Sequence, residues 1–66
     1  MLDTRLERLK SIEANAWRNY QEARRKAQEK RNAARLDAVI ETGEKWSKHN
    51  HALHYYIENG KTYRDY

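Results

Sequence analysis

Apolar positions recur at steps of three and four residues along the first half of the chain. On an α-helix, which turns by about 100° per residue, such positions form a single stripe. The stripe comprises Leu2, Leu6, Leu9, Ile12, Ala16, Tyr20, Ala23, Ala27, Ala34 and Ala38, interrupted by Lys30. This pattern predicts an amphipathic helix with a coiled-coil-like seam, rich in leucine at its amino end and in alanine further on.

The limits of this helix are predicted from its flanking residues. Residues 4–7, TRLE, have the form of a capping box in which Thr4 and Glu7 satisfy each other's backbone amides. Residues with high helix propensity continue to Thr42, and Gly43 suits the left-handed conformation that commonly ends a helix. The sequence therefore predicts a long first helix over about residues 4–42.

A second, shorter helix is predicted over about residues 47–58, with Ser47 as its cap and Asn59–Gly60 as its stop. Its apolar face comprises Trp46, Leu53, Tyr56 and Ile57. This face is expected to fold onto Leu36, Val39 and Ile40 of the first helix, which gives an unequal helical hairpin. One continuous helix through Gly43 is the alternative, because an interior glycine costs only about 1 kcal/mol.

The length of 66 residues predicts one small all-α domain, residues 1–66, with a short polar tail over 59–66. Chains this short bury only about 60% of their unfolded surface, and without cysteine neither a disulfide nor a thiolate metal site stabilises the fold. A second copy is therefore expected to pack along the alanine seam as a homodimeric helical bundle. The residues expected to self-associate are Leu6, Leu9, Ala16, Tyr20, Ala23, Ala27 and Ala34.

Hydropathy gives an expectation for the cellular environment. No apolar run approaches the roughly 20 residues that cross a bilayer, and the charged start MLDTRLERLK is unlike a signal peptide. A soluble, cytoplasmic protein without membrane contact is expected.

Positive charge is concentrated in the middle of the chain. Residues 18–35 hold seven cations and two acids, a net charge of +5, whereas residues 1–17 are neutral and the whole chain carries +4. Three partners could explain this excess: a nucleic acid, an anionic membrane surface or an acidic protein. The alternative is a solvated helix surface on which acids pair with neighbouring cations. The expected contact residues are Trp17, Arg24, Arg25, Arg31 and Arg35, with Tyr63 and Tyr66 from the tail.

Every large aromatic side chain in the sequence carries a polar group, since there are five tyrosines, two tryptophans and no phenylalanine. This composition is typical of interfaces, where one edge of an aromatic ring is buried and the other contacts water. Trp46 and Tyr56 are expected in the core. Trp17, Tyr55, Tyr63 and Tyr66 are the candidate anchors for a partner.

A histidine cluster is the remaining candidate for chemistry. His51, His54 and Glu58 share a helical face and form a weak candidate for a metal-binding site. The alternative is that these histidines lie on the surface or at an interface and bind no metal. The sequence has no cysteine nucleophile and no glycine-rich phosphate loop. No catalytic residue and no cofactor are therefore predicted.

These patterns together favour a non-enzymatic helical adaptor or inhibitor that binds another protein through a basic, aromatic-studded surface. The alternative is largely non-specific binding of a DNA or RNA backbone by residues 18–35.

Overall fold

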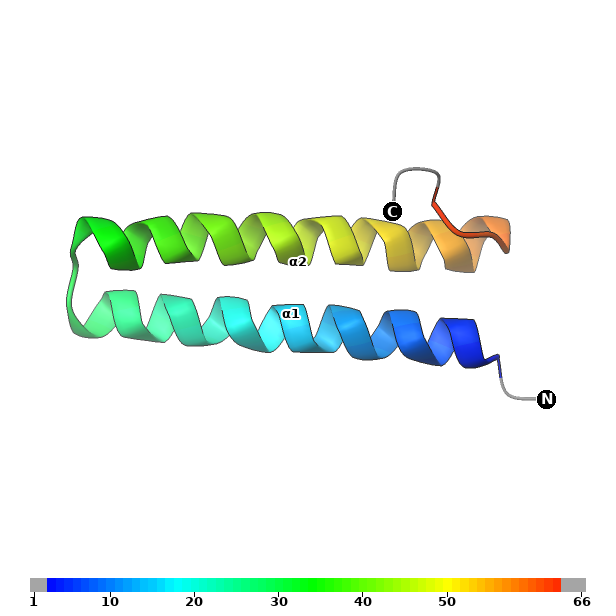
Figure 1. Ribbon diagram of the computed structural model, residues 1–66, viewed down its shortest axis with the longest axis horizontal. Coiled ribbons are helices and arrows are strands. Elements are labelled where there is room, and N and C mark those ends of the chain that lie inside the picture. The colour runs from blue at the N-terminus through cyan, green and yellow to red at the C-terminus, as the bar shows by residue number, and fades with distance from the viewer. Residues whose placement is uncertain (1–2, 64–66) are drawn as a thin grey trace.

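The computed structural model describes residues 3–63, which form two antiparallel helices joined by a short turn (Figure 1). Helix α1 spans Thr4–Glu29 and helix α2 spans Ala33–Asn59. The two helices lie side by side in one layer, so that the molecule measures 46 × 22 × 13 Å. The prediction of an all-α helical hairpin is confirmed.

The predicted position of the turn is wrong. The first helix ends at Glu29 instead of Thr42, and the two arms have 26 and 27 residues. The Asn32 side chain caps α2 by accepting from the Arg35 backbone N–H at 2.9 Å. The Arg35 guanidinium in turn donates to the Lys26 carbonyl at 2.6 Å. This carbonyl lies in the last turn of α1, where few backbone N–H donors remain further along the helix. The turn therefore forms without glycine or proline, at the point where Lys30 interrupts the apolar stripe.

The outer ends of the helices are close to the predicted ones. Asp3, and not Thr4, is the N-cap of α1, because its carboxylate accepts from the Arg5 and Leu6 backbone N–H groups at 3.1 Å each. The Glu7 amide donates to the Asp3 carbonyl, so the predicted capping box does not form. The predicted stop of α2 is confirmed: Gly60 has a φ of 69° and donates to the Tyr56 carbonyl at 2.8 Å.

Gly43 lies inside α2 and ends no helix. A Cβ at this position would lie 3.1 Å from Cε1 of Tyr20, a separation tighter than ordinary van der Waals contact. The glycine therefore makes room for a tyrosine ring from α1. Ser47, predicted to cap the second helix, lies in the middle of α2 and therefore caps no helix.

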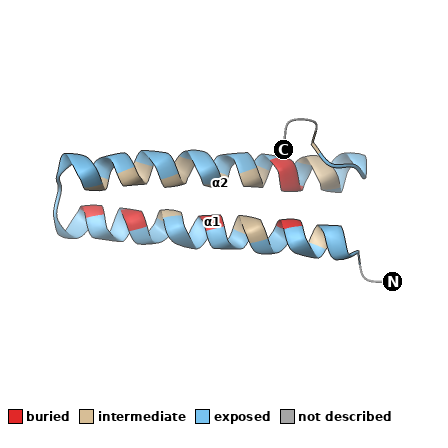
Figure 2. Ribbon diagram, viewed as in Figure 1, coloured by how far each residue is buried: buried red, intermediate tan, exposed pale blue. Residues whose placement is uncertain are grey.

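The core is a thin line of small side chains between the helices (Figure 2). Its members are Leu9, Ala16, Ala23 and Ala27 on α1, and Ala52 and Leu53 on α2. The predicted seam is thus a helix contact, as expected. The helix that covers the seam is α2 of the same chain. The four buried side chains of α1 are therefore not accessible to a second copy of the chain.

Two further predictions follow the misplaced turn. Leu36, Val39 and Ile40 belong to the same helix as Trp46 and Leu53, so these two faces do not pack on each other. The face with Trp46 and Leu53 packs on α1, whereas Leu36 and Ile40 remain 44% and 60% exposed. Ala34, predicted to lie in the seam, is exposed in the first turn of α2.

A basic-rimmed groove as candidate interaction surface

An aromatic cluster joins the two helices at their middle. The Trp17 and Trp46 rings have centroids 4.8 Å apart, and Tyr20 stacks on Trp46 at 6.0 Å with an interplanar angle of 7°. The Trp46 indole N–H donates to Glu13 Oε1 at 2.8 Å. Trp17, a predicted partner anchor, is therefore also a structural contact, although 37% of it stays exposed. Trp46, predicted to lie in the core, is half-buried between the helices.

Polar contacts hold the open end of the hairpin. The Tyr56 hydroxyl donates to Asp3 Oδ2 at 2.9 Å, and the Arg5 guanidinium donates to Thr62 Oγ1 at 3.2 Å. The Leu6 backbone N–H and then the Tyr56 hydroxyl lower the pKa of Asp3 by donating to its carboxylate. The same bond to Asp3 raises the pKa of Tyr56. This carboxylate thus serves as both helix cap and interhelix tie.

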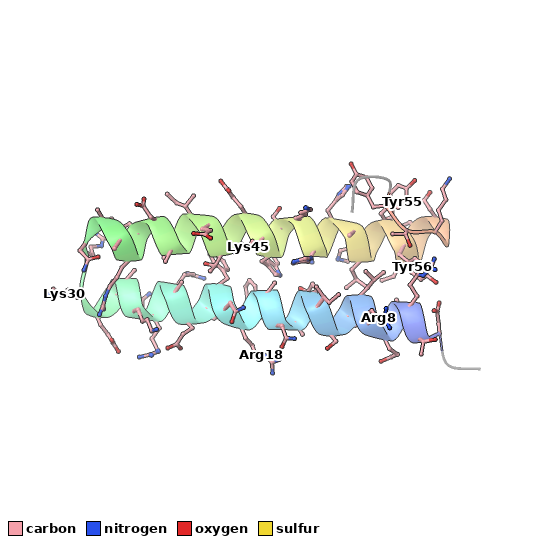
Figure 3. All side chains as sticks on the ribbon, in the orientation of Figure 1. Arg8, Arg18, Lys30, Lys45, Tyr55 and Tyr56 are labelled. Atoms are coloured by element: carbon pink, nitrogen blue, oxygen red, sulfur yellow. The ribbon has the colours of Figure 1, made fainter. Side chains whose placement is uncertain are left out.

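The tail returns along α2. Tyr63 is half-buried, with its ring edge-on to His51 at 4.6 Å and to Tyr55 at 5.1 Å. Figure 3 shows Tyr55 on the outer side of α2, where the tail passes. Tyr63 is therefore occupied within the chain, and Tyr66 lies outside the described residues.

The weak metal candidate does not assemble. Within residues 3–63, no group of three or more His, Cys, Asp or Glu side chains is arranged to hold a metal ion. Both histidines are exposed, and the His51 ring lies edge-on to Tyr63.

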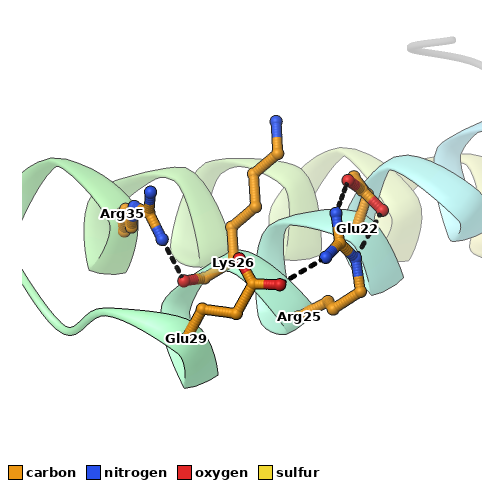
Figure 4. Close-up of polar contacts among 5 residues, drawn as sticks. All are labelled: Glu22, Arg25, Lys26, Glu29 and Arg35. Carbon is orange, nitrogen blue, oxygen red and sulfur yellow. Dashed lines mark hydrogen bonds and ion pairs between the residues drawn. The ribbon is translucent and has the colours of Figure 1, made fainter.

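Two of the predicted contact arginines are engaged inside the hairpin (Figure 4). Arg25 donates to Glu22 Oε2 at 3.1 Å and to Glu29 Oε1 at 2.6 Å, and these carboxylates raise the pKa of Arg25 further. Arg35 donates to the Lys26 carbonyl. Part of the positive charge predicted to face a partner is thus neutralised by neighbours, as expected of a solvated helix surface.

Arg24 and Arg31 have a different environment. They line a shallow groove of about 180 Å³ near the turn, together with Ala27, Gln28, Leu36 and Val39. The Arg24 guanidinium lies over the Tyr20 ring, 5.6 Å from its centroid. Within the described part of the chain, neither arginine forms an ion pair. The groove therefore has an aliphatic floor and two cations without counterions.

The chemistry of the groove suits recognition. Its lining has no carboxylate, imidazole or hydroxyl group. Leu36, which lines the groove, and its neighbour Ile40 are exposed apolar side chains beside the two arginines. A ligand that carries both apolar and anionic groups complements this surface.

Sequence reasoning identified Arg24 and Arg31 but missed the floor of the groove. Leu36 and Val39 were expected to pack inside the hairpin, because the turn was placed after them. The interruption of the apolar stripe at Lys30 was the signal that places them on a separate helix.

None of the helices formed by residues 3–63 is both long and apolar enough to span a membrane. Comparison of the chain with protein-family models, with curated proteins and with solved structures gives no match.

Proposed function

We propose that this protein is a non-enzymatic interaction protein, an adaptor or inhibitor, whose binding surface is the groove between Arg24, Arg31 and Leu36. One observation carries the proposal: Arg24 and Arg31, which form no ion pair within the described residues, line a single concave site together with the exposed Leu36. The mechanism is occupancy, in which the groove covers an apolar and acidic surface of a protein target. Arginine pairs at the rim favour fast, salt-sensitive association.

Nucleic-acid binding by residues 18–35 is the second candidate, and the charge distribution supports it less well. Arg25 pairs with Glu22 and Glu29, and Arg35 serves the end of α1. A phosphate backbone would neutralise Arg24 and Arg31 but would leave Leu36 and Ile40 in water. A protein partner removes that apolar surface from water, which stabilises the complex.

Site-specific crosslinking in cells that encode the protein tests this proposal. A photo-reactive amino acid replaces Leu36 in the groove, and the matched control carries it at Arg8, which is exposed on α1 outside the groove. We expect protein adducts from position 36, none from position 8, and loss of the adducts in the R24E/R31E background.

The outcomes separate the two candidates. Adducts that resist nuclease and disappear with protease support a protein partner. Nuclease-sensitive adducts, together with salt-reversible retention of the purified protein on DNA or RNA, would replace the proposal with its alternative. Equal labelling from positions 36 and 8 would contradict a binding role for the groove.

A further inference from the structure

We propose that the occupant of the groove is a single amphipathic α-helix of a partner protein, with an apolar stripe and an acidic flank. This inference rests on the proposed function of the groove as a protein-binding site, and it names the kind of segment that binds there. The spacing of exposed side chains on both helices, the charges beside them and the bonding of the backbone support it.

Two stripes of side chains border the groove, one on each helix. Arg24 and Leu36 line the groove itself, so the stripes that contain them lie on the same face of the hairpin. Each stripe follows steps of four, three and four residues, which keep side chains on one flank of a helix over roughly three turns. The α1 stripe comprises Trp17, Gln21, Arg24 and Gln28, and the α2 stripe comprises Leu36, Ile40, Gly43 and Ser47. None of these residues is buried.

A pair of such stripes suits a third helix. Side chains at steps of three and four residues form the ridges and grooves into which a neighbouring helix packs its own side chains. The backbone gives a second reason, because both stripes belong to continuous helices whose N–H groups and carbonyls bond within the helix. An extended peptide would find no backbone partner on this face, whereas a helical ligand satisfies its own backbone groups.

The exposed apolar side chains distinguish this face from the opposite one. Trp17, Leu36 and Ile40 are 37%, 44% and 60% exposed, and all three belong to the two stripes. Over the same turns, the opposite flanks carry exposed polar residues such as Asn19, Glu22 and Lys26 on α1, and Glu41 and Lys45 on α2. A helix that packs on the stripes removes exposed apolar area from water, which stabilises the complex.

The charges of the face favour an acidic ligand. Neither the two stripes nor the groove lining contains a carboxylate, and Arg24 and Arg31 form no ion pair within the described residues. Arg24 lies on α1 and Arg31 just beyond its end, whereas Leu36 and Ile40 lie on α2. A helix seated between them therefore meets cations on one flank and apolar side chains on the other. Glutamate or aspartate on the first flank provides the complementary charge.

The part of the chain that the structure describes leaves this face uncovered. The tail beyond α2 returns past Tyr55 and His51, which belong to the half of α2 remote from the turn. The groove lies beside the turn, at the other end of the hairpin. The face is therefore accessible to another molecule.

A designed peptide tests the inference on the full chain. The probe is a helix of about 18 residues with a leucine stripe at steps of three and four, and a row of glutamates on each side of the stripe, so that it fits in either direction. Fluorescence anisotropy of the labelled probe, titrated with the protein, is expected to show saturable binding with a Kd below about 1 mM. Two peptides of the same length are expected not to bind. One has the same residues in an order without a stripe, and the other has a central proline.

A matched pair of isoleucine variants locates the apolar contact. Ile40→Lys is expected to weaken binding of the probe at least about tenfold, because it places a cation in the apolar stripe. The control is Ile57→Lys, the same change at a side chain that is 56% exposed near the end of α2 and outside the stripes. This control is expected to keep the wild-type affinity.

Charge reversal tests the acidic flank. R24E/R31E is expected to weaken binding of the probe at least about tenfold, and R8E/R18E, which makes the same change in net charge outside the face, is expected to leave it unchanged. A probe with lysine in place of glutamate is expected to bind R24E/R31E more tightly than it binds the wild type. Circular dichroism reports whether each variant keeps its helices.

Equal affinity for the striped and the shuffled peptide, or binding of neither, would overturn the inference. Equal losses for Ile40→Lys and Ile57→Lys would also overturn it. A wild type that light scattering shows as a dimer, dissociated by Ile40→Lys, would assign the face to a second copy instead. In each case, crosslinking from position 36 to a different protein would leave the proposed function intact, whereas no protein adduct at all would remove both.

Discussion

Gly43 provides a sharp test of how the hairpin packs. Alanine at an exposed interior position of a helix is favoured over glycine by about 1 kcal/mol, so Gly43→Ala would stabilise α2 if the position were open. In the structure, the new Cβ would lie 3.1 Å from Cε1 of Tyr20. The two helices must therefore separate, or the ring must shift, by a few tenths of an ångström.

The Tyr20 ring has little freedom to make that shift. It stacks on Trp46 at 6.0 Å, lies 5.8 Å from Trp17, and is covered by the Arg24 guanidinium at 5.6 Å. Overpacking by one carbon typically costs about 1–3 kcal/mol. Set against the gain in helix propensity, Gly43→Ala is expected to leave the free energy of unfolding unchanged or to lower it by up to about 2 kcal/mol.

A double-mutant cycle with Tyr20→Leu isolates the contact. Leucine has no atom at the position of the ring Cε1, so Gly43→Ala is expected to stabilise this background by about 1 kcal/mol. Urea unfolding followed by circular dichroism, at one fixed protein concentration, gives the four free energies. An equal gain of about 1 kcal/mol in both backgrounds would contradict the role of Gly43 as a seat for the ring.

Three further predictions concern the contacts that hold the helices together. Leu53→Ala empties a position that is only 8% exposed, and a loss of about 2–5 kcal/mol is expected, enough to leave a domain this small largely unfolded in a thermal melt. Trp46→Phe removes the donor to Glu13, and Glu13→Ala removes the acceptor, so the two changes are expected to be non-additive in chemical denaturation. Simple additivity would show that the 2.8 Å bond contributes nothing. The folded-state pKa of Asp3 lies below its ordinary value of 3.8, so its contribution to stability is complete above that pH and is lost as the pH falls through the folded-state value. Asp3→Asn is expected to flatten the acid limb of a stability–pH profile below pH 3.8, and an unchanged limb would assign it to other carboxylates.

The helical class and the inner stripe of α1 could be predicted from local pattern. Leu9, Ala16, Ala23 and Ala27 recur with helical period, and this periodicity requires only that the stripe be covered by another helix. The stop at Gly60 is equally local, because a glycine that follows a polar residue at the end of an apolar pattern adopts the left-handed conformation at little cost.

The identity of the covering helix depended on where the chain turns. Asn32 is a residue type that often caps helices, and here it caps α2 by accepting from the Arg35 backbone N–H. The Arg35 guanidinium also donates across the turn to the Lys26 carbonyl near the end of α1. That contact exists only in the folded hairpin. Local propensity favoured Gly43 as the helix end instead.

The candidate site illustrates the same division. The sequence by itself determined that Arg24 and Arg31 are basic, that Leu36 and Ile40 are apolar, and that each set lies on a helix. Only the tertiary structure decided that Arg25 pairs with its own acids and that Arg24 meets Leu36 across a groove. The physical reason is that a groove is formed by two helices at once, and its composition is set by the position of the turn that brings them together.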